Sequence, residues 1–238
     1  MNRDVKQIIR ASTMLALVWL AAGCAAIRSA TAPPPAAPPS LVEAKRQVRE
    51  YVASGRYEAD IAAIVTPARE YLERRARGGG RLAIVLDIDE TALSNLPHLR
   101  ANDYGFIVAG SCELERGPCG FFAWAQMARA EPIKPVLALV RVARERGVAV
   151  FFLTGRPERL RAATERNLRA AGYEWTAVLL KADDLVTRSA VEFKALERKK
   201  LVDQGYTIIA NIGDQMSDLE GGHAERTYQL PNPFYFVP

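Results

Sequence analysis

The chain has 238 residues, 49% of them hydrophobic, and a formal net charge of +5. This length and composition are typical of one domain with a substantial core plus a short additional segment. Residues 1–23 carry +2 of the charge, which leaves only +3, dispersed over the rest of the chain. So weak a positive charge excludes a nucleic-acid polymer as an expected partner.

The first 23 residues have the pattern of a secretory signal peptide. Basic residues up to Arg10 precede an apolar run over 14–22, which is shorter than the roughly 20 residues that span a bilayer. Gly23 and Cys24 follow this run and resemble a bacterial lipobox, with Ala21 at the position where leucine is usual. We therefore expect an exported protein of the bacterial cell envelope, anchored to a membrane by lipid on Cys24. Simple cleavage further along the chain is the alternative.

The next segment, residues 24–40, is dominated by alanine and proline and is predicted to form an extended tether. The folded domain is then expected to occupy residues 41–238. Apolar residues at helical spacing predict helix from 41 to about 77, including a second helical segment over 59–72. Three glycines at 78–80 end this region.

From residue 82 onward, segments typical of strands and helices alternate. The predicted strands cover residues 82–86, 148–153, 177–180, 206–212 and, as a short fifth strand, 228–230. The predicted helices between them cover residues 135–146, 157–171 and 191–204. This alternation predicts the α/β class, a parallel sheet with right-handed crossovers and helices on both faces.

About 60 residues separate the first two strands, more than one crossover helix requires. We predict a small helical insertion over about 98–132, beside the mouth of the site. The insertion contains an aromatic cluster of Phe121, Phe122 and Trp124. These rings are expected to form the core of the insertion or, alternatively, to stack on a substrate.

Cys112 and Cys119 also lie in this insertion, with six residues between them. In a chain bound for an oxidising compartment, this pair is a candidate disulfide. Two unpaired cysteines in a surface loop are the alternative. A metal site is disfavoured, because no third or fourth soft ligand lies nearby.

Two carboxylates, Asp87 and Asp89, directly follow the first predicted strand. Residues two apart in a strand point to the same side, and ligands of open α/β sheets bind at the carboxyl ends of the strands. Both carboxylates can therefore reach one substrate, one as a nucleophile and the other as a proton donor and acceptor. Burying them together requires a cation or hydrogen bonds in compensation.

Other strand ends add further polar groups. Thr154 and Gly155 follow the second strand, where a hydroxyl and backbone N–H groups at a helix N-terminus would form a phosphate cradle. A plain helix cap is the alternative interpretation. Asp214 and Asp218 follow the fourth strand and are expected to face the same pocket. Together with Asp87, Asp214 supplies the oxygen ligands that suit Mg²⁺.

Lys194 lies on the predicted helix before the fourth strand. A lysine near a carboxylate cluster can hold a nucleophile ionised and neutralise phosphoryl oxygens.

The segments 87–91, 153–156, 194 and 213–218 resemble, in order, the four motifs of the haloacid dehalogenase-like (HAD) superfamily. Finer features narrow the resemblance to the acid phosphatases of HAD subfamily IIIB, over roughly residues 82–238. That group includes bacterial class C lipoprotein acid phosphatases and plant phosphatases similar to vegetative storage proteins. The features are the segments 91–97, 197–201 and 230–233.

The resemblance implies a role for each motif residue. Asp87 would be the nucleophile that forms an aspartyl-phosphate, and Asp89 would protonate the leaving alcohol and then activate water. Thr154, with Gly155, would bind the phosphoryl group, and Lys194 would stabilise both that group and Asp87.

The resemblance also implies an Mg²⁺ site. Its ligands would be Asp87, Asp214 and the backbone carbonyl of Asp89, with Asp218 in direct or indirect support. Met216 stands where the family commonly has tryptophan. This departure removes no reacting group.

The expected function is Mg²⁺-dependent hydrolysis of small phosphate monoesters, such as nucleoside monophosphates and aryl phosphates. The site is expected to be open, because the 39 residues between Thr154 and Lys194 leave no room for a large second cap. Phe234 and Tyr235 are candidates for stacking on a base, with simple packing as the alternative. A non-catalytic surface or storage protein that retains the fold is the competing function. The resemblance also allows a homodimer.

Overall fold

The computed structural model describes residues 38–183 and 189–237. Within it, Pro39–Pro238 form one compact unit. The predicted signal peptide, Cys24 and nearly all of the tether lie outside the described residues. Among the helices that the structure describes, none combines the length and the apolar character that crossing a membrane requires.

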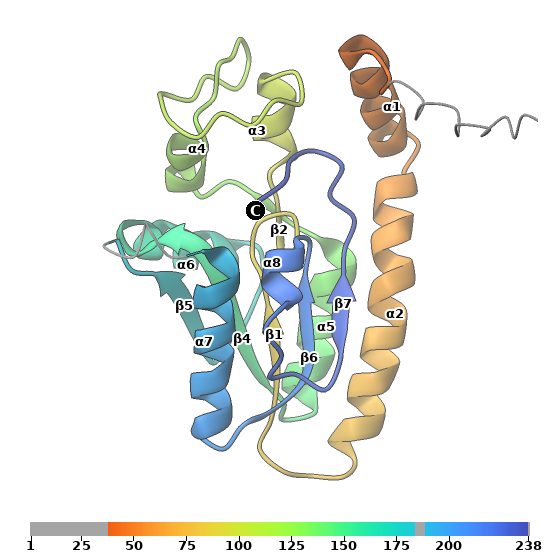
Figure 1. The fold of residues 1–238 in the computed structure, drawn as a ribbon, viewed down its shortest axis with the longest axis vertical. Helices are drawn as coiled ribbons and strands as arrows, with labels where there is room; N and C mark the ends of the chain where they lie inside the picture. The colour runs from red at the N-terminus through yellow and green to blue at the C-terminus, as the bar shows by residue number, and fades with distance from the viewer. Residues whose placement is uncertain (1–37, 184–188, 238) are drawn as a thin grey trace, which may run out of the picture. The chain divides into compact units, whose positions relative to one another are not determined.

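In the described part of the chain, a five-stranded parallel sheet has the order β5-β4-β1-β6-β7 (Figure 1). Its central strand, β1, is buried along its whole length, as expected for a parallel strand covered on both faces. The parallel sheet predicted from the sequence is thus confirmed. The strands are β1 (Leu82–Leu86), β4 (Ala149–Pro157), β5 (Ala177–Lys181), β6 (Thr207–Gly213) and β7 (Thr227–Gln229).

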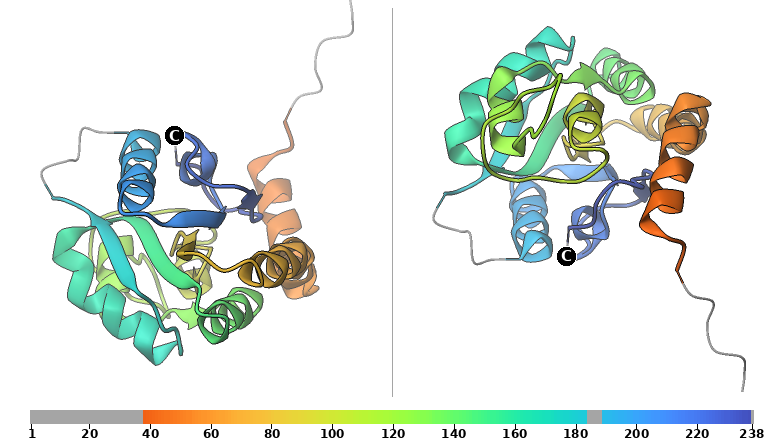
Figure 2. Two further views of the ribbon diagram at one scale, coloured as in Figure 1. Left: turned by 90° about the horizontal axis from the view of Figure 1, so that it is seen from below. Right: turned by 90° about the horizontal axis from the view of Figure 1, so that it is seen from above.

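Alternate side chains of the strands enter two apolar cores, one on each face of the sheet. Ile84 and Phe152 pack with α2 (Arg56–Ala76), α5 (Lys134–Glu145) and α6 (Arg161–Ala170). On the opposite face, Val85 and Phe151 pack with Phe193 and Leu201 of α7 (Ala190–Asp203). The end-on views show the sheet between these helices (Figure 2). Helices therefore cover both faces, as predicted.

Two helices occupy the region before β1. Ser40 begins α1 (Leu41–Ala53), because its side chain accepts a hydrogen bond from the backbone N–H of Glu43 at 3.3 Å. The chain turns at Gly55, whose φ of 76° lies in the left-handed region that glycine adopts without strain. The second helix, α2, then packs its buried face on the sheet.

The segment between β1 and α5 forms a separate layer over the carboxyl end of the sheet (Figure 1). It contains α3 (Leu96–Ala101) and α4 (Phe121–Met127). At its base, β2 (Leu93–Ser94) pairs antiparallel with β3 (Glu131–Pro132). The side chain of Asn102 bonds both backbone groups of Cys119, each at 2.8 Å, and a disulfide joins Cys119 to Cys112.

The predicted start of the helix at residue 157 is wrong. The strand β4 continues to Pro157, which pairs with Lys181 of β5, and a short 3-10 turn (Glu158–Leu160) precedes α6. A residue before proline is pushed toward the extended region, so Arg156 favours continuation of the strand. The phosphate cradle predicted at residues 154–156 is consequently not at a helix N-terminus.

We predict that Ile84→Ala lowers the free energy of unfolding by about 2–5 kcal/mol, because it leaves a cavity at the centre of the sheet. Urea unfolding measures this change. Val42→Ala serves as the control, since Val42 on α1 is 79% exposed, and should shift stability by less than about 0.5 kcal/mol. Equal effects of the two substitutions would contradict the assignment of Ile84 to the core.

Candidate active site

The carboxyl ends of β1, β4 and β6 converge with α7 on one pocket of about 180 Å³. Ligands of open α/β sheets bind at this edge. The acidic side chains of the pocket are Asp87, Asp89, Asp214 and Asp218. Its aromatic side chains are Phe106, Phe121, Phe122 and Tyr235. The pocket therefore combines a charged floor with an apolar wall.

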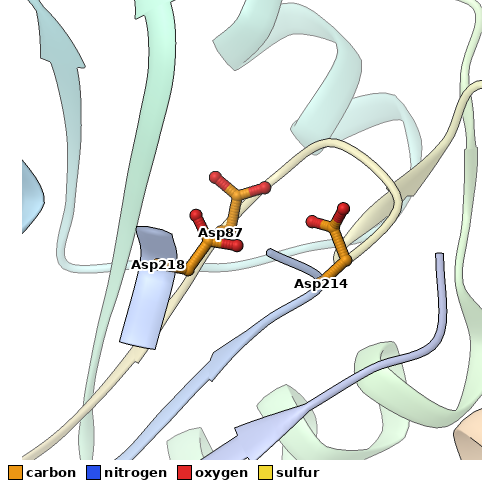
Figure 3. A group of neighbouring side chains, drawn as sticks. All are labelled: Asp87, Asp214 and Asp218. Carbon is orange, nitrogen blue, oxygen red and sulfur yellow. The ribbon is translucent and has the colours of Figure 1, made fainter. Parts of the chain in front are cut away.

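Three carboxylates meet at the floor. Asp87 follows β1, Asp214 follows β6, and Asp218 belongs to α8 (Met216–Leu219) (Figure 3). One oxygen from each lies within 4.8 Å of the others, and all three residues are buried. So much buried negative charge is costly unless positive charge accompanies it.

Lys194 of α7 supplies part of that charge. Its Nζ donates to Asp87 Oδ1 at 2.6 Å and also to Asp218 Oδ1. Burial would lower the pKa of Lys194, but the two carboxylates outweigh burial and raise it above its usual value. When ionised, three carboxylates and one ammonium leave a net formal charge of −2. Burial and the neighbouring Asp218 accordingly raise the pKa of Asp214 to about 6.

Hard oxygen donors with this residual charge suit a divalent cation. The clustering of Asp87, Asp214 and Asp218 therefore fits the metal site predicted from the sequence, whereas the side chain of Asp89 lies outside this cluster.

Gly213 is required by the position of Asp218. The side chain of Asp218 turns back toward the start of α8, where its Oδ2 accepts the backbone N–H of Gln215 at 2.9 Å. This places Asp218 against the Cα of Gly213, and a Cβ there would lie 2.3 Å from the Cβ of Asp218. Only glycine leaves room for this carboxylate.

Asp89 faces the same pocket but has different partners. Arg156 donates to it through Nη2 at 2.7 Å and Nε at 3.0 Å, and Asn95 Nδ2 donates at 2.9 Å. Burial would raise the pKa of Asp89, but Arg156 and Asn95 outweigh burial and hold it below its usual value. Arg156 belongs to the segment 153–156 that resembles a family motif, but the sequence alone assigned it no role. The signal that could have found it is a basic residue three positions after the predicted strand, beside Thr154 and Gly155.

The loop that carries Asp89 is fixed by a buried network that the sequence interpretation also missed. Glu90, fully buried with a φ of 54°, accepts from Tyr57 Oη at 2.9 Å and from the backbone N–H of Asn95 at 2.6 Å. Burial raises the pKa of Glu90 to about 8. Trp124 of α4 donates to Asn95 Oδ1 at 2.8 Å. The layer over the sheet is thereby connected to the acidic loop.

The remaining predicted residues divide between pocket and packing. Gly155 lines the pocket, while Thr154 is fully buried and its hydroxyl accepts the backbone N–H of Arg156 at 3.1 Å. Tyr235 also lines the pocket, with its ring 4.5 Å from that of Phe106.

Phe234 instead packs on the rings of Tyr57 and Tyr104, at 5.3 and 6.0 Å. Among the aromatic residues predicted for the insertion, Phe121 and Phe122 line the pocket, and Trp124 is buried in the core.

Residues 11–238 match the family model of the HAD superfamily, subfamily IIIB (acid phosphatase). The chain belongs to this family. It is accordingly an acid phosphatase, a phosphoric monoester hydrolase.

Plant proteins are among the relatives of this subfamily IIIB chain. It is 34% identical to acid phosphatase 1 of Solanum lycopersicum, over 80% of this chain and 73% of the relative. It is 31% identical to vegetative storage protein 2 of Arabidopsis thaliana, over 82% and 72%. The class C acid phosphatase of Bacillus anthracis shares the fold, with a TM-score of 0.64 at 22% identity over 81% of this chain and 86% of that one.

We predict that Gly213→Ala lowers phosphatase activity by about 10- to 100-fold, because the added methyl displaces Asp218 from the carboxylate cluster. The measurement is kcat/KM on an aryl phosphate, with thermal unfolding to confirm that the variant folds. Gly78→Ala is the control, since its added Cβ would meet only ordinary contacts near Arg75. Full activity of folded Gly213→Ala would show that Asp218 is dispensable.

Proposed function

We propose that this acid phosphatase hydrolyses phosphate monoesters with Mg²⁺, through an aspartyl-phosphate on Asp87. The observation that carries the proposal is the placement of Asp87. Its carboxylate is hydrogen-bonded to Lys194 at 2.6 Å, clusters with Asp214 and Asp218, and shares a pocket with Asp89.

Mg²⁺ fits the donors of this site. Asp87, Asp214 and Asp218 would hold it, and the backbone carbonyl of Asp89 remains a predicted ligand. When bound, the ion neutralises charge on the phosphoryl oxygens and on the clustered carboxylates. Lys194 contributes a fixed positive charge beside the reacting oxygen of Asp87.

In the first half of the reaction, a carboxylate oxygen of Asp87 attacks phosphorus. The bond between phosphorus and the ester oxygen breaks, and the electron pair leaves with that oxygen. Arg156 and Asn95 favour the carboxylate form of Asp89, so acidic pH supplies the protonated form, which donates a proton to the departing oxygen and makes the product a neutral alcohol. Lys194 and the backbone at Gly155, which line the pocket, would bind the transferring phosphoryl group.

In the second half, the Asp89 carboxylate accepts a proton from a water molecule, and the water oxygen attacks phosphorus. The bond from phosphorus to the Asp87 oxygen breaks, which restores Asp87 and releases inorganic phosphate. Arg156 and Asn95 keep the Asp89 carboxylate turned toward the pocket for both steps. The two carboxyl groups thus perform separate tasks within one site.

The substrates we propose are aryl phosphates and nucleoside monophosphates. The wall of Phe106, Phe121, Phe122 and Tyr235 is apolar and lies beside the acidic floor. Such a wall favours an aromatic leaving group over a strongly hydrated one. Phe234 packs on Tyr57 and Tyr104, which supports simple packing for this residue and leaves base stacking to Tyr235.

A storage role without catalysis is the second candidate, and the similarity to a vegetative storage protein favours it. The intact set of Asp87, Asp89, Lys194 and Asp214 opposes it, because a storage protein has no use for this arrangement of charges.

We predict that Asp87→Asn reduces hydrolysis of an aryl phosphate to background, because the neutral amide cannot attack phosphorus. Asp89→Asn should lower kcat by about 10²- to 10⁴-fold through loss of proton transfer.

A chelator should abolish activity and added Mg²⁺ should restore it. Steady-state assays from acidic to neutral pH measure all three effects.

Thermal unfolding of both variants provides the control for misfolding. A folded wild-type chain with Mg²⁺ that hydrolyses neither aryl phosphates nor nucleoside monophosphates would favour the storage role. Full activity in the presence of a chelator would refute the metal requirement and would leave the rest of the proposed function standing.

We also propose export to the bacterial cell envelope with lipid on Cys24, which lies outside the described residues. The disulfide between Cys112 and Cys119 supports an oxidising destination. Cys24→Ser should move the protein from the membrane fraction to the soluble fraction and remove the lipid mass from its mature N-terminus. Fractionation and mass spectrometry measure this, and an unchanged membrane fraction would refute the anchor. The homodimer remains a prediction, and light scattering of the purified protein, which measures its molar mass in solution, would test it.

A further inference from the structure

The last described segment of the chain, residues 231–237, leaves β7 and crosses the carboxyl end of the sheet (Figure 1). We name it the strap. Two of its residues, Tyr235 and Val237, line the active-site pocket. The strap therefore forms part of the wall that a leaving group would meet.

Neutral side chains surround the carboxylate of Asp214. Asn232 Nδ2 and Gln215 Nε2 both donate to its Oδ2, at 2.7 and 2.6 Å, and Thr91 Oγ1 donates to its Oδ1 at 3.1 Å. A carboxylate oxygen has two acceptor positions, so Oδ2 is fully occupied while Oδ1 retains one. The two amides thereby favour coordination of a cation through Oδ1 alone.

The same two amides hold the strap. Asn232 Oδ1 accepts the backbone N–H groups of Phe234 and Tyr235, at 2.9 and 3.3 Å. Gln215 Oε1 accepts the N–H of Val237 at 3.1 Å, and Gln215 Nε2 also reaches the carbonyl of Tyr235 at 3.4 Å. Each amide thus bonds a carboxylate of the cation site with one end and the backbone of the pocket wall with the other.

We propose that Asn232 and Gln215 are positioning residues that couple the cation site to the leaving-group wall through the strap. This inference rests on the proposed function, because the proposed function makes Asp214 a ligand of the cation and Tyr235 part of the wall that the leaving group meets. A displacement of the strap changes the orientation of Asp214, and a displacement of Asp214 changes the position of Tyr235. One hydrogen-bonded unit sets both cation affinity and substrate preference.

Amides suit this coupling better than charged groups. An amide donates to Asp214 and accepts from the strap without changing the net charge of the carboxylate cluster. The strap is also anchored away from the amides, because Phe234 packs on Tyr57 of α2 and on Tyr104. Loss of one amide should therefore shift the strap without releasing it.

The test measures binding by calorimetry, with MgCl₂ as one probe and phenylphosphonate and methylphosphonate as the others. Asn232→Ala should weaken Mg²⁺ binding by about 10- to 100-fold, as loss of a hydrogen bond to a metal ligand typically does. It should also reduce the preference for the phenyl ligand by roughly 2- to 10-fold, because Tyr235 shifts. Gln215→Ala should show both effects and provides a second variant if Asn232→Ala does not fold.

Two further variants distinguish coupling between the two sites from a general disturbance of the strap. Tyr235→Ala should reduce the phenyl preference and leave Mg²⁺ affinity unchanged, since its side chain takes no part in the bonds to Asp214. Phe236→Ala should change neither quantity, because Phe236 lies on the same strap but is 74% exposed.

Loss of Mg²⁺ affinity without a change in phenyl preference, in either amide variant, would overturn the coupling. Unchanged values for both quantities, or a wild-type chain that binds no Mg²⁺, would overturn it as well. A wild-type chain that binds all three probes but turns over no phosphate ester would refute only the proposed function.

Discussion

The structure depends on one electrostatic constraint, the burial of three carboxylates beside a single lysine. Lys194 pairs with Asp87 and Asp218, Asp214 lies in the same cluster, and the residual negative charge requires a further positive group. Neighbouring features of the fold support this arrangement. Gly213 makes room for Asp218, and amides and a hydroxyl, rather than further charges, hold Asp214. The uncompensated negative charge of this cluster opposes folding when no cation is bound, and the same charge favours binding of a divalent cation.

The parallel sheet brings these charges together. Its strands run in one direction, so residues separated by more than a hundred positions reach the same edge, as Asp87 after β1 and Asp214 after β6 do. The layer over that edge performs a different task. It carries Phe106, Phe121 and Phe122 of the aromatic wall, and the strap adds Tyr235. Trp124 connects the layer to Asp89 through Asn95. The charged groups thus lie at the strand ends and on the adjoining helices, and the aromatic wall comes from the layer and the strap.

The order of strands and helices and the acidic motifs were predictable because they depend on neighbours in the sequence. A buried strand is a run of apolar residues, and the carboxylates follow it directly. Partners from distant segments were not predictable in this way. Arg156 lies 67 positions from Asp89, and Tyr57 lies 33 from Glu90, so only tertiary packing selects them. The start of α6 was misplaced because proline was interpreted as the first turn of a helix, whereas β4 extends to that residue.

The disulfide in the layer over the sheet has a consequence for where the protein can mature. Asn102 pins the backbone of Cys119 to the end of α3, and Phe121 of the aromatic wall is two residues further on. The sheet and its carboxylates need no oxidation to assemble, whereas the disulfide forms only by oxidation of the two cysteines. A chain folded in a reducing cytosol would assemble its carboxylate cluster, while the layer that carries Phe121 would still lack its disulfide. Oxidation of Cys112 and Cys119 would then be the last step of maturation, and substrate selectivity would be complete only in an oxidising compartment.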